Sequence, residues 1–387
     1  STQSYRDALD GQSVQTKHKW LNWQWDNSIS YSYTFDDVHS LNAMIGSNMS
    51  KYTHNYNQQN ASGYGNDLFG YKYSSGAPDK EKYYLGSDFS SYSLMSYLAR
   101  LNYVYDSRYY ITLTYRADGS SRFGPKHKWG SFPSVAVSWN MAEEAFMENA
   151  KGMVNNFRFK LGYGIAGNQN IPNYTYMTIY NPSISLGSTI LRNYGLYGNP
   201  DLRWEKQKQL NAGIEAGFFK DRINLLFDVF HIQNEDLLMM RSMASTSGYS
   251  NQISNVGALQ NRGVELTLNA VPVQTRDFYW DINFNISADR NKVTKLFDNM
   301  TEIYNVGGWS NNEIQREGNI FLGESLNNIY VYKFDRIVQE SDMDYVNSLQ
   351  LGSRIVKPGD ILPLDKNGDN IINDQDRYIV GKTTPDF

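Results

Sequence analysis

The sequence predicts an all-β chain, part of an antiparallel β-barrel that crosses a membrane, and three observations support this. Apolar and polar residues alternate with period two along most of the chain, as in strands with one apolar and one polar face. The alternating stretches run for about 10 to 15 residues, the length of a membrane-crossing strand, whereas soluble strands average about 5 or 6. Short and long connections alternate between them, as in membrane barrels. A soluble sandwich also alternates apolar and polar residues, but it has no reason to follow this rule of connections.

Composition excludes several classes of protein. The 387 residues are 40% hydrophobic and 20% charged, which is typical of a folded chain, and 14% are aromatic. No run reaches the about 18 apolar residues of a membrane helix. A formal net charge of −4 without a basic stripe argues against a nucleic-acid partner. The absence of cysteine excludes disulfide scaffolds, cysteine zinc sites and thiol catalysis.

Each expected strand follows from its own alternation. In the first, Leu21, Trp23 and Ile29 share one face, while Asn22 and Gln24 lie on the other. The same analysis gives about ten strands, at residues 20–34, 38–50, 92–105, 109–118, 131–140, 156–166, 203–218, 222–233, 258–271 and 278–289. Aromatic residues near the strand ends are expected to form the girdles at the membrane interfaces. They are Trp20, Trp23, Tyr33, Tyr103, Tyr105, Tyr109, Trp129, Phe132, Trp139, Trp204, Phe218, Tyr279 and Trp280.

The connections distinguish the two ends of the strands. Tight turns are expected at residues 35–37, 106–108, 219–221 and 272–277, and a longer connection with a short helical turn at 141–155. Long loops are expected at residues 51–91, 119–130, 167–202 and 234–257. Residues 1–289 therefore form barrel strands with short periplasmic turns and long extracellular loops, and residues 290–387 form a long extracellular region. Because lipid does not tolerate an unpaired strand edge, we expect the chain to be a segment of a larger barrel.

Several stretches of sequence, in order along the chain, resemble one family. They are residues 109–112 (YYIT), 116–124 (RADGSSRFG), 129–134 (WGSFPS), 161–164 (LGYG), 167–169 (GNQ), 202–206 (LRWEK), 255–257 (NVG), 261–266 (NRGVEL), 358–360 (PGD), 365–376, Gly381 and 384–387 (TPDF). They resemble the SusC-like (SusC/RagA-type) TonB-dependent outer-membrane transporters of Bacteroidetes. The resemblance covers about residues 90–387 well, and the first ninety residues only by their strand pattern.

The resemblance implies an outer-membrane barrel of about 22 strands with an N-terminal plug, embedded in the lipid of that membrane. It also implies a SusD-like surface lipoprotein that covers the barrel, and import of glycans, or in some members peptides, with energy from the TonB complex. The plug domain and the segment that contacts TonB are absent from this chain, so energy coupling is assigned to none of its residues. We interpret the family stretches as fold maintenance, because Gly119 suits a turn and Gly263 a bulge.

A candidate metal site lies in residues 365–376. Side-chain oxygens occupy positions one, three, five, nine and twelve, and position seven would supply its backbone carbonyl, a spacing that wraps a chain around Ca²⁺. Position six is Asn370, which tolerates the left-handed conformation, and position twelve is an aspartate rather than the usual glutamate. We expect a structural Ca²⁺; the alternative is a polar turn held by side-chain to backbone hydrogen bonds. The expected ligands are Asp365, Asn367, Asp369, Ile371, Asn373 and Asp376.

Aromatic residues of the long loops are candidate contacts with substrate or with the lipoprotein. Rings stack on the apolar faces of sugars, and neighbouring amides bind their hydroxyls, although tyrosine also serves loop packing and protein interfaces. The candidates are Tyr71, Tyr73, Tyr174, Tyr176, Tyr194, Tyr197 and Trp309. Three cations are expected to face the lumen, where they either line the solute path or pair with acids such as Asp118 or Glu215. They are Arg116, Arg158 and Lys160.

The expected function is import of oligosaccharides or peptides, and two rivals stay open. The first is a non-transporting receptor or adhesin built on a barrel. The second is a hydrolase at the barrel rim, which the sequence does not support. Its five histidines show no metal-ligand spacing, and no nucleophile motif is present. The pair Glu143 and Glu144 is expected to be solvated surface, so we expect no enzyme activity.

Overall fold

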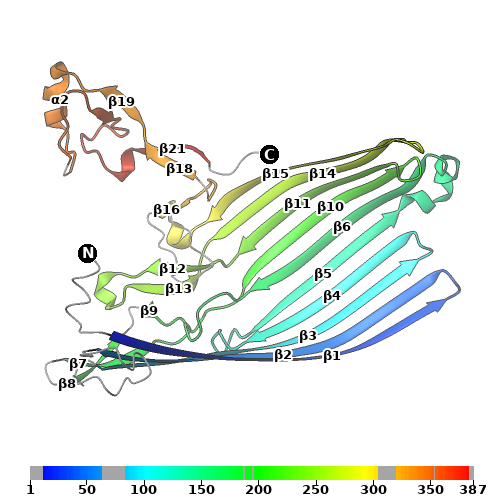
Figure 1. Ribbon diagram of the computed structural model, residues 1–387, viewed down its shortest axis with the longest axis horizontal. Coiled ribbons are helices and arrows are strands. Elements are labelled where there is room, and N and C mark those ends of the chain that lie inside the picture. The colour runs from blue at the N-terminus through cyan, green and yellow to red at the C-terminus, as the bar shows by residue number, and fades with distance from the viewer. Residues whose placement is uncertain are drawn as a thin grey trace. The chain divides into compact units, whose positions relative to one another are not determined.

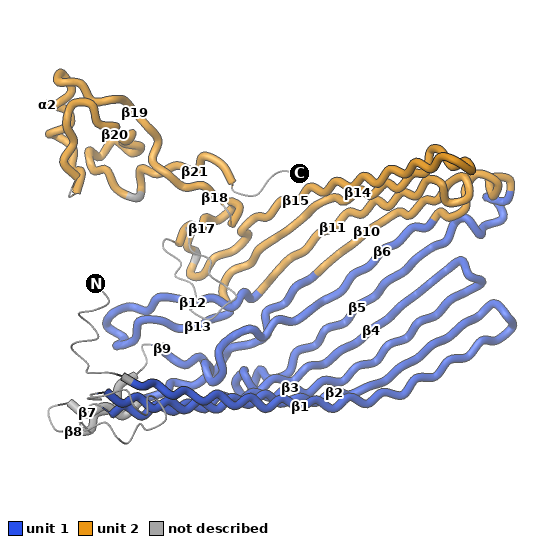
Figure 2. Tube along the Cα trace, viewed as in Figure 1, with its two compact units in different colours: residues 1–148, 158–208, 236–255 blue, residues 149–157, 209–235, 256–387 orange. Residues whose placement is uncertain are grey.

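Ten long strands dominate the computed structural model of the protein (Figure 1). The structure describes residues 12–62, 83–185, 188–193, 196–303, 320–326, 328–352 and 354–382. The chain forms two compact units, which Figure 2 colours separately. The first consists of residues 1–148, 158–208 and 236–255, and the second of residues 149–157, 209–235 and 256–387.

The ten strands belong to one sheet whose order follows the chain. The strand pairings within it are antiparallel. The strands are β1 (Gln12–Phe35), β2 (His39–Ser62), β3 (Tyr84–Tyr105), β4 (Tyr109–Ser120), β5 (Trp129–Asn140), β6 (Val154–Asn168), β10 (Glu205–Phe218), β11 (Ile223–Glu235), β14 (Ala258–Gln274) and β15 (Tyr279–Lys295). The predicted number, order and direction of the strands are therefore confirmed.

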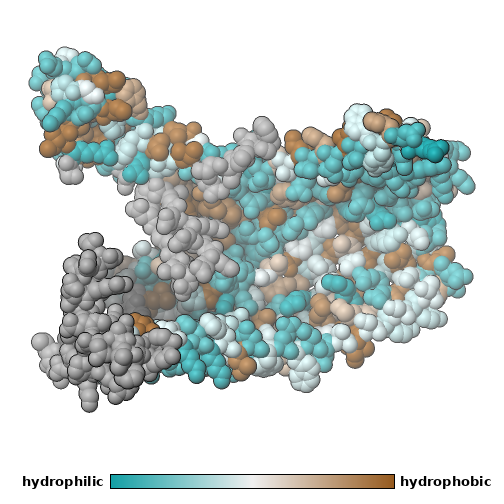
Figure 3. Space-filling model, viewed as in Figure 1, coloured by the Kyte–Doolittle hydropathy of each residue, from teal (hydrophilic) through white to brown (hydrophobic). Residues whose placement is uncertain are grey.

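The predicted apolar rows lie open on one face of these strands. On β1, Trp25, Ile29 and Tyr31 are 61, 72 and 59% exposed, and Leu113 on β4 and Ile286 on β15 are each 44% exposed. No second layer of protein covers these rows in the described part of the chain. Such a face fits contact with lipid chains, so we call it the outward face and the opposite one the lumen face. Figure 3 shows hydrophobic and hydrophilic residues interspersed along the strands, as this alternation requires.

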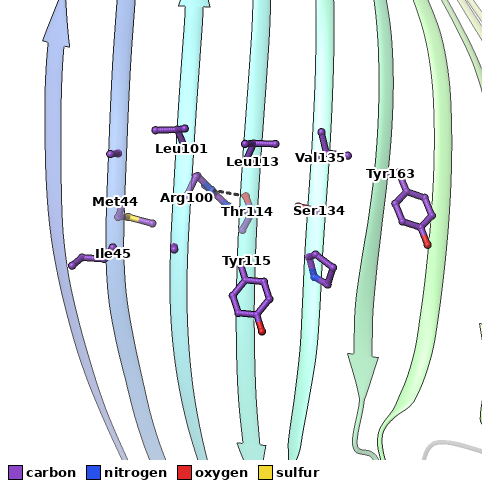
Figure 4. Close-up of a pocket in the computed structure, with 13 residues that line it drawn as sticks. Met44, Ile45, Arg100, Leu101, Leu113, Thr114, Tyr115, Ser134, Val135 and Tyr163 are labelled. Atoms are coloured by element: carbon purple, nitrogen blue, oxygen red, sulfur yellow. Dashed lines mark hydrogen bonds between the residues drawn. The ribbon is translucent and has the colours of Figure 1, made fainter.

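A shallow apolar hollow on β2 to β5 illustrates the alternation (Figure 4). Leu101, Leu113 and Val135 are directly opposite one another on β3, β4 and β5 and therefore share a face. One residue away, Arg100 Nε donates a hydrogen bond of 3.3 Å to Thr114 Oγ1. The apolar lining comes mainly from outward-facing residues, so the hollow belongs to the face that fits lipid, and no ligand is assigned to it.

The tight turns use left-handed backbone at polar residues. Between β1 and β2, Asp36 and Asp37 have φ of 49° and 54°, and between β3 and β4, Asp106 and Ser107 repeat these values. Each connection has three residues, and its two successive positive φ angles are those of a turn that matches the right-handed twist of the flanking strands. The predicted helical turn in residues 141–155 is also present, as the 3₁₀ helices η4 (Met141–Glu143) and η5 (Ala145–Ala150). We call this end of the strands the turn end.

Glu144 is not solvated surface, which corrects the expectation for this residue. It is 9% exposed and ties the β5–β6 connection to two strands. Its Oε1 accepts hydrogen bonds from Tyr109 Oη at 2.6 Å and Trp139 Nε1 at 2.9 Å, and its Oε2 accepts one from Arg108 Nη1 at 3.2 Å. The bonds from Tyr109 and Trp139 lower the pKa of Glu144 below its usual value.

The predicted loop at residues 51–91 is wrong over much of its length. β2 continues to Ser62 and β3 begins at Tyr84, so residues 51–62 and 84–91 are paired strand. Their side chains are largely polar, and apolar alternation alone therefore ended the strands too early. At this end, called the loop end, the long connections also carry short strands. These are β7 (Tyr180–Ser185), β8 (Ser188–Asn193), β9 (Leu196–Tyr197), β12 (Leu238–Ser242) and β13 (Asn251–Asn255), with the 3₁₀ helix η6 (Ser245–Ser247).

After β15 the chain builds small sheets and a core of its own. Val338, Val346, Leu349 and Leu362 pack together, each at most 8% exposed. β18 pairs with β21, β19 with β20, and β16 with β17. None of the described helices is long and apolar enough to cross a membrane. The elements are η7 (Phe297–Asn299), β16 (Glu302–Ile303), β17 (Ile320–Phe321), β18 (Asn328–Tyr332), β19 (Phe334–Ile337), η8 (Glu340–Asp342), α2 (Met343–Ser348), β20 (Ile361–Pro363), η9 (Asp374–Asp376) and β21 (Arg377–Lys382).

Candidate functional site

The lumen face of β1 to β4 is a network of hydrogen-bonding side chains. Asn102 accepts from Thr112 Oγ1 at 2.9 Å and donates to Asn42 Oδ1 at 3.4 Å, linking three strands. Towards the loop end, Asp26 accepts hydrogen bonds from Gln24 and Asn48. Amides and hydroxyls that bond across strands keep this face polar and ordered, as a water-filled path requires.

Aromatic rings gather on the lumen face at the loop end of β1 and β2. Trp20 lies directly opposite His54, and His18 directly opposite Tyr56, so all four share this face. The Trp20 ring is nearly parallel to the rings of His18 and His54, with centroids 5.1 Å away from each. His18 Nδ1 and His54 Nε2 lie 3.0 Å apart, and the Tyr56 ring centroid is 5.0 Å from that of His18.

The row continues onto β3 through Tyr52 and Tyr92, which are also directly opposite each other. Their rings are stacked, with centroids 5.3 Å apart. We call His18, Trp20, Tyr52, His54, Tyr56 and Tyr92 the ring ladder. Trp20 was expected in the outward girdle, and that interpretation is wrong, because Trp20 shares its face with Asn22, Gln24 and Asp26. The parity of Trp20 within β1 was the signal that could have placed it correctly.

Arg122 fixes one end of the ring ladder to the loop after β6. Its guanidinium lies 4.0 Å from the centroid of the Tyr92 ring, a cation–π contact. Nε donates to Asn173 Oδ1 at 3.0 Å, and Nη1 donates to the Gln169 carbonyl at 3.2 Å. Burial lowers the pKa of Arg122. Asn173 in turn donates to Ser90 Oγ at 2.6 Å, and the Ser91 amide donates to Tyr174 Oη, so the loop is bonded to β3 just before Tyr92.

The predicted loop tyrosines have different surroundings. Tyr174 has φ of 69°, and its hydroxyl accepts a hydrogen bond of 3.0 Å from the Ser91 amide, which makes it a structural contact. Tyr197, 40% exposed, lies 4.7 Å from Tyr249 between ring centroids, and Tyr249 bonds Tyr180 through their hydroxyls at 2.8 Å. Tyr249 was not among the expected aromatic contacts. Tyr176 is half-buried. Tyr71, Tyr73, Tyr194 and Trp309 lie outside the described residues.

Beneath these loops lies a small core, the loop-end core, made of Phe123, Phe132, Leu202 and Trp204. Each is at most 5% exposed. The Trp204 ring lies 5.2 Å from Phe123 and 5.3 Å from Phe132 between centroids, and its Nε1 donates to the Lys128 carbonyl at 2.9 Å. Phe132 and Trp204 were expected in the interfacial girdle, and that interpretation is wrong, since protein covers both rings.

Four of the family stretches, at residues 116–124, 129–134, 167–169 and 202–206, meet at the loop-end core. A Cβ on Gly167 would overlap the Phe132 ring, and one on Gly124 would overlap the Pro200 carbonyl oxygen. Next to Trp204, Arg203 pairs with Asp236 at 2.8 Å, and this hydrogen bond raises the pKa of Arg203. These stretches thus hold the loops together. The two reasons expected for them are wrong, because Gly119 is a paired residue of β4 and Gly263 is regularly paired on both sides within β14.

The three predicted lumen cations do not form one cluster. Arg116 Nε donates to both carboxylate oxygens of Asp118 at 2.8 Å, and its Nη2 donates to Ser96 Oγ at 3.1 Å, near the loop end of β4. Arg158 lies opposite Asn140 and Lys160 opposite Ser138, near the turn end. The Arg158 guanidinium is 5.2 Å from the Tyr110 ring centroid. The ion-pair alternative is therefore observed for Arg116.

The candidate calcium loop is folded by its own hydrogen bonds. The two Asp365 oxygens accept from the amides of Gly368 at 2.7 Å and Asn370 at 2.9 Å, and Asn370 has φ of 61°. Asp376 is fully buried and accepts from the amides of Lys366 and Asn373. Among the residues that the structure describes, no three acidic, histidine or cysteine side chains gather at one point.

The chain is similar in sequence to known proteins over most of its length. A family model described as "TonB dependent receptor-like, beta-barrel" matches residues 1–378. TonB-dependent receptor P39 of Formosa agariphila is 31% identical over 94% of this chain and 37% of its own length. TonB-dependent receptor SusC of Bacteroides thetaiotaomicron is 31% identical over 76% of this chain and 29% of its own length.

A solved structure of a transporter shares the fold of this chain. A structure of the RagAB peptide transporter superposes with a TM-score of 0.74 at 26% identity, over 84% of this chain and 35% of that chain. The chain spans 29 to 37% of the length of the curated relatives named above. These relatives are named as receptors and transporters, not as enzymes.

Proposed function

Because this chain belongs to the TonB-dependent receptor-like β-barrel family of the outer membrane, we propose that the protein containing it imports oligosaccharides. Cargo would enter at the loop end, which is extracellular in outer-membrane barrels. A SusD-like surface lipoprotein would cover that end, and the TonB complex would supply energy through a plug region. The likeness to SusC and to RagAB supports this arrangement.

The ring ladder is the observation that carries the choice of cargo. Six rings on the lumen face offer apolar surfaces, and the Trp20 side chain is 57% exposed. Amide groups of Gln24 and Asn48 lie further along the same face. Sugars combine apolar ring faces with many hydroxyls, so a wall of rings beside amides suits them. The alternative cargo is a peptide, because the RagAB relative is titled a peptide transporter.

Growth tests separate these cargoes. A strain that lacks the full-length gene, grown on a panel of glycans and peptides, is expected to lose growth on one class of oligosaccharide. Loss of growth on peptides alone would show import but reject the oligosaccharide. Unchanged growth on every source would favour the non-transporting receptor or adhesin.

Trp20→Ala in the full-length protein is expected to weaken binding of the identified cargo about 2- to 12-fold, since an aromatic contact contributes about 0.5–1.5 kcal/mol. Equilibrium titration with the cargo measures this change. The matched control is Trp25→Ala, which removes an exposed indole from the outward face of the same strand and should leave cargo affinity unchanged. Equal affinities for Trp20→Ala and the parent would remove the ring ladder from the binding site.

We also propose that residues 365–376 bind a structural Ca²⁺. The donor set consists of oxygen atoms, which a hard cation prefers, and Asn367 and Asp369 are exposed. The Asp365 oxygens are already oriented by the Gly368 and Asn370 amides. Ile371, Asn373 and Asp376 would complete the set. The ion would stiffen the loop that leads into β21.

Removal of the first donors tests the calcium proposal. Asp365→Ala and Asp369→Ala are each expected to weaken Ca²⁺ binding about tenfold or more, because each removes a charged ligand. Metal content after chelation and equilibrium dialysis against Ca²⁺ measures this. Asp344→Ala, which removes an exposed carboxylate of α2, is the control. If both loop variants retain as much Ca²⁺ as the parent, the loop is a turn held by hydrogen bonds alone.

A further inference from the structure

A row of basic side chains crosses β11, β14 and β15 on the outward face. Arg262 on β14 lies directly opposite His231 on β11 and directly opposite Arg290 on β15. Directly paired residues of antiparallel strands share a face, so these three side chains stand side by side. One step further, Lys292 lies opposite Gln260. We call His231, Arg262, Arg290 and Lys292 the basic row; all four are exposed.

The basic row lies where the apolar rows end. Two residues towards the turn end, Val229, Val264 and Ala288 occupy the same face, and Val229 and Val264 are 41 and 42% exposed. Phe227, Leu266 and Ile286 follow in the next row. The outward face of these strands therefore changes from apolar to cationic within one step at the loop end. On an outer-membrane barrel this level is the outer headgroup region of the bilayer.

The described part of the chain shows no acidic partner for the two arginines of the basic row. Like charges at directly opposite positions destabilise a sheet, and Arg262 and Arg290 occupy such positions. Neither arginine forms an ion pair within the described part of the chain. Asp289 pairs with Gly263 and so faces the lumen.

An open hollow of about 480 Å³ adjoins the row. The charged residues that line it are Arg262, Asp289, Arg290, Lys292, Glu324 and Lys382. Arg262, Arg290 and Lys292 of the basic row alone outnumber the two carboxylates, which suits the hollow to an anion.

We propose that the basic row binds the phosphate groups of a glycolipid in the outer leaflet. Arginine presents paired N–H donors that match phosphate oxygens, and the two guanidinium groups sit next to each other on adjacent strands. The acyl chains of such a lipid would lie along Val264 and Ala288 and the apolar rows below. This continuity of cationic and apolar surface favours an amphiphile over the acidic surface of a protein, which would not need the apolar rows. The bound phosphate would also relieve the repulsion between Arg262 and Arg290.

The test uses the full-length protein in nanodiscs of neutral lipid. Bisphosphorylated lipid A, its dephosphorylated form and inorganic phosphate are titrated against the parent and against Arg262→Gln/Arg290→Gln. The parent is expected to bind the bisphosphorylated lipid about tenfold or more tightly than the double variant, because charged hydrogen bonds are lost. The dephosphorylated lipid should not distinguish the two proteins. Arg276→Gln, an exposed arginine in the turn between β14 and β15, is the control and should bind as the parent does.

A second readout keeps the test independent of misfolding. Without the lipid, the double variant should be at least as resistant to denaturant as the parent, because the substitution removes two like charges. Equal binding of the bisphosphorylated lipid by the parent and the double variant would overturn the proposal. Inorganic phosphate that displaces the lipid at equal concentration would overturn the lipid assignment.

Discussion

Replacing Trp204 with alanine is expected to lower the free energy of unfolding of the full-length barrel by about 3–5 kcal/mol, the range for buried large aromatic residues. The side chain is 5% exposed, lies against Phe123 and Phe132, and donates a hydrogen bond to the Lys128 carbonyl. The substitution leaves a cavity in the loop-end core and removes one of the two hydrogen bonds of the Lys128 carbonyl, which keeps the bond from the Ser120 amide. Since the contacts join segments 76 residues apart, the loops after β4 and before β10 would separate first.

Denaturant titration of the reconstituted full-length protein, followed by the electrophoretic shift between folded and unfolded barrel, measures this effect. Trp204→Phe keeps an aromatic ring but loses the hydrogen bond, so its cost should fall well below that of the alanine variant. Lys126→Ala, on an exposed residue of the same loop, should change stability by less than about 0.5 kcal/mol. A Trp204→Ala protein as stable as the parent would show that the loop-end core does not hold the loops.

Strand number, order and turns could be predicted from the sequence because they depend on local patterns. The period-two rule decides which face a side chain occupies, and it works for Leu113 and for Ile286 because both lie on long unbroken strands. The tight turns followed from polar residues such as Asp36 and Asp37, which reach the left-handed region at modest cost.

What packs over a face could not be predicted, because that depends on residues far apart in the chain. Trp204 follows the strand pattern of a girdle residue, yet Phe123 and Phe132 cover it. Glu144 has the composition of a surface residue, and its burial depends on Tyr109 and Trp139. Alternation of apolar and polar residues does not reveal a strand that has few aliphatic side chains. For this reason the loop-end half of β2 could not be predicted as a strand.

The sequence predicted the residue type of the candidate site, aromatic side chains, but not its position in the fold. Aromatic residues were expected to meet the cargo, and they were sought in the loops, where Tyr174 instead bonds the Ser91 amide. The ring ladder lies on the strands, because β1 and β2 extend well beyond their predicted ends. Within β1, His18 and Trp20 alternate in step with Asn22 and Gln24, which indicates the lumen face. This alternation could have predicted the β1 residues of the ring ladder from the sequence.

Placing a charge on the outward face tests the membrane assignment directly. Leu113→Arg is expected to lower the free energy of unfolding by about 2–4 kcal/mol, because the arginine would face lipid near the middle of β4. Leu113 is 44% exposed and has apolar neighbours, Leu101 and Val135, on both adjacent strands, so no carboxylate is at hand to pair with the new cation. The same denaturant titration in lipid vesicles measures the loss.

The neighbouring residue supplies the control, because Thr112 lies on the lumen face of the same strand. Thr112→Arg loses one hydrogen bond to Asn102, which costs about 1 kcal/mol, and its guanidinium meets water rather than lipid. Both residues lie at nearly the same level of the bilayer. The difference between the two losses in free energy of unfolding therefore reports which face the arginine occupies and not how deep it lies. Equal losses at Leu113 and Thr112 would therefore mean that hydrocarbon does not cover the outward face, and the lipid-binding role of the basic row would fall with it.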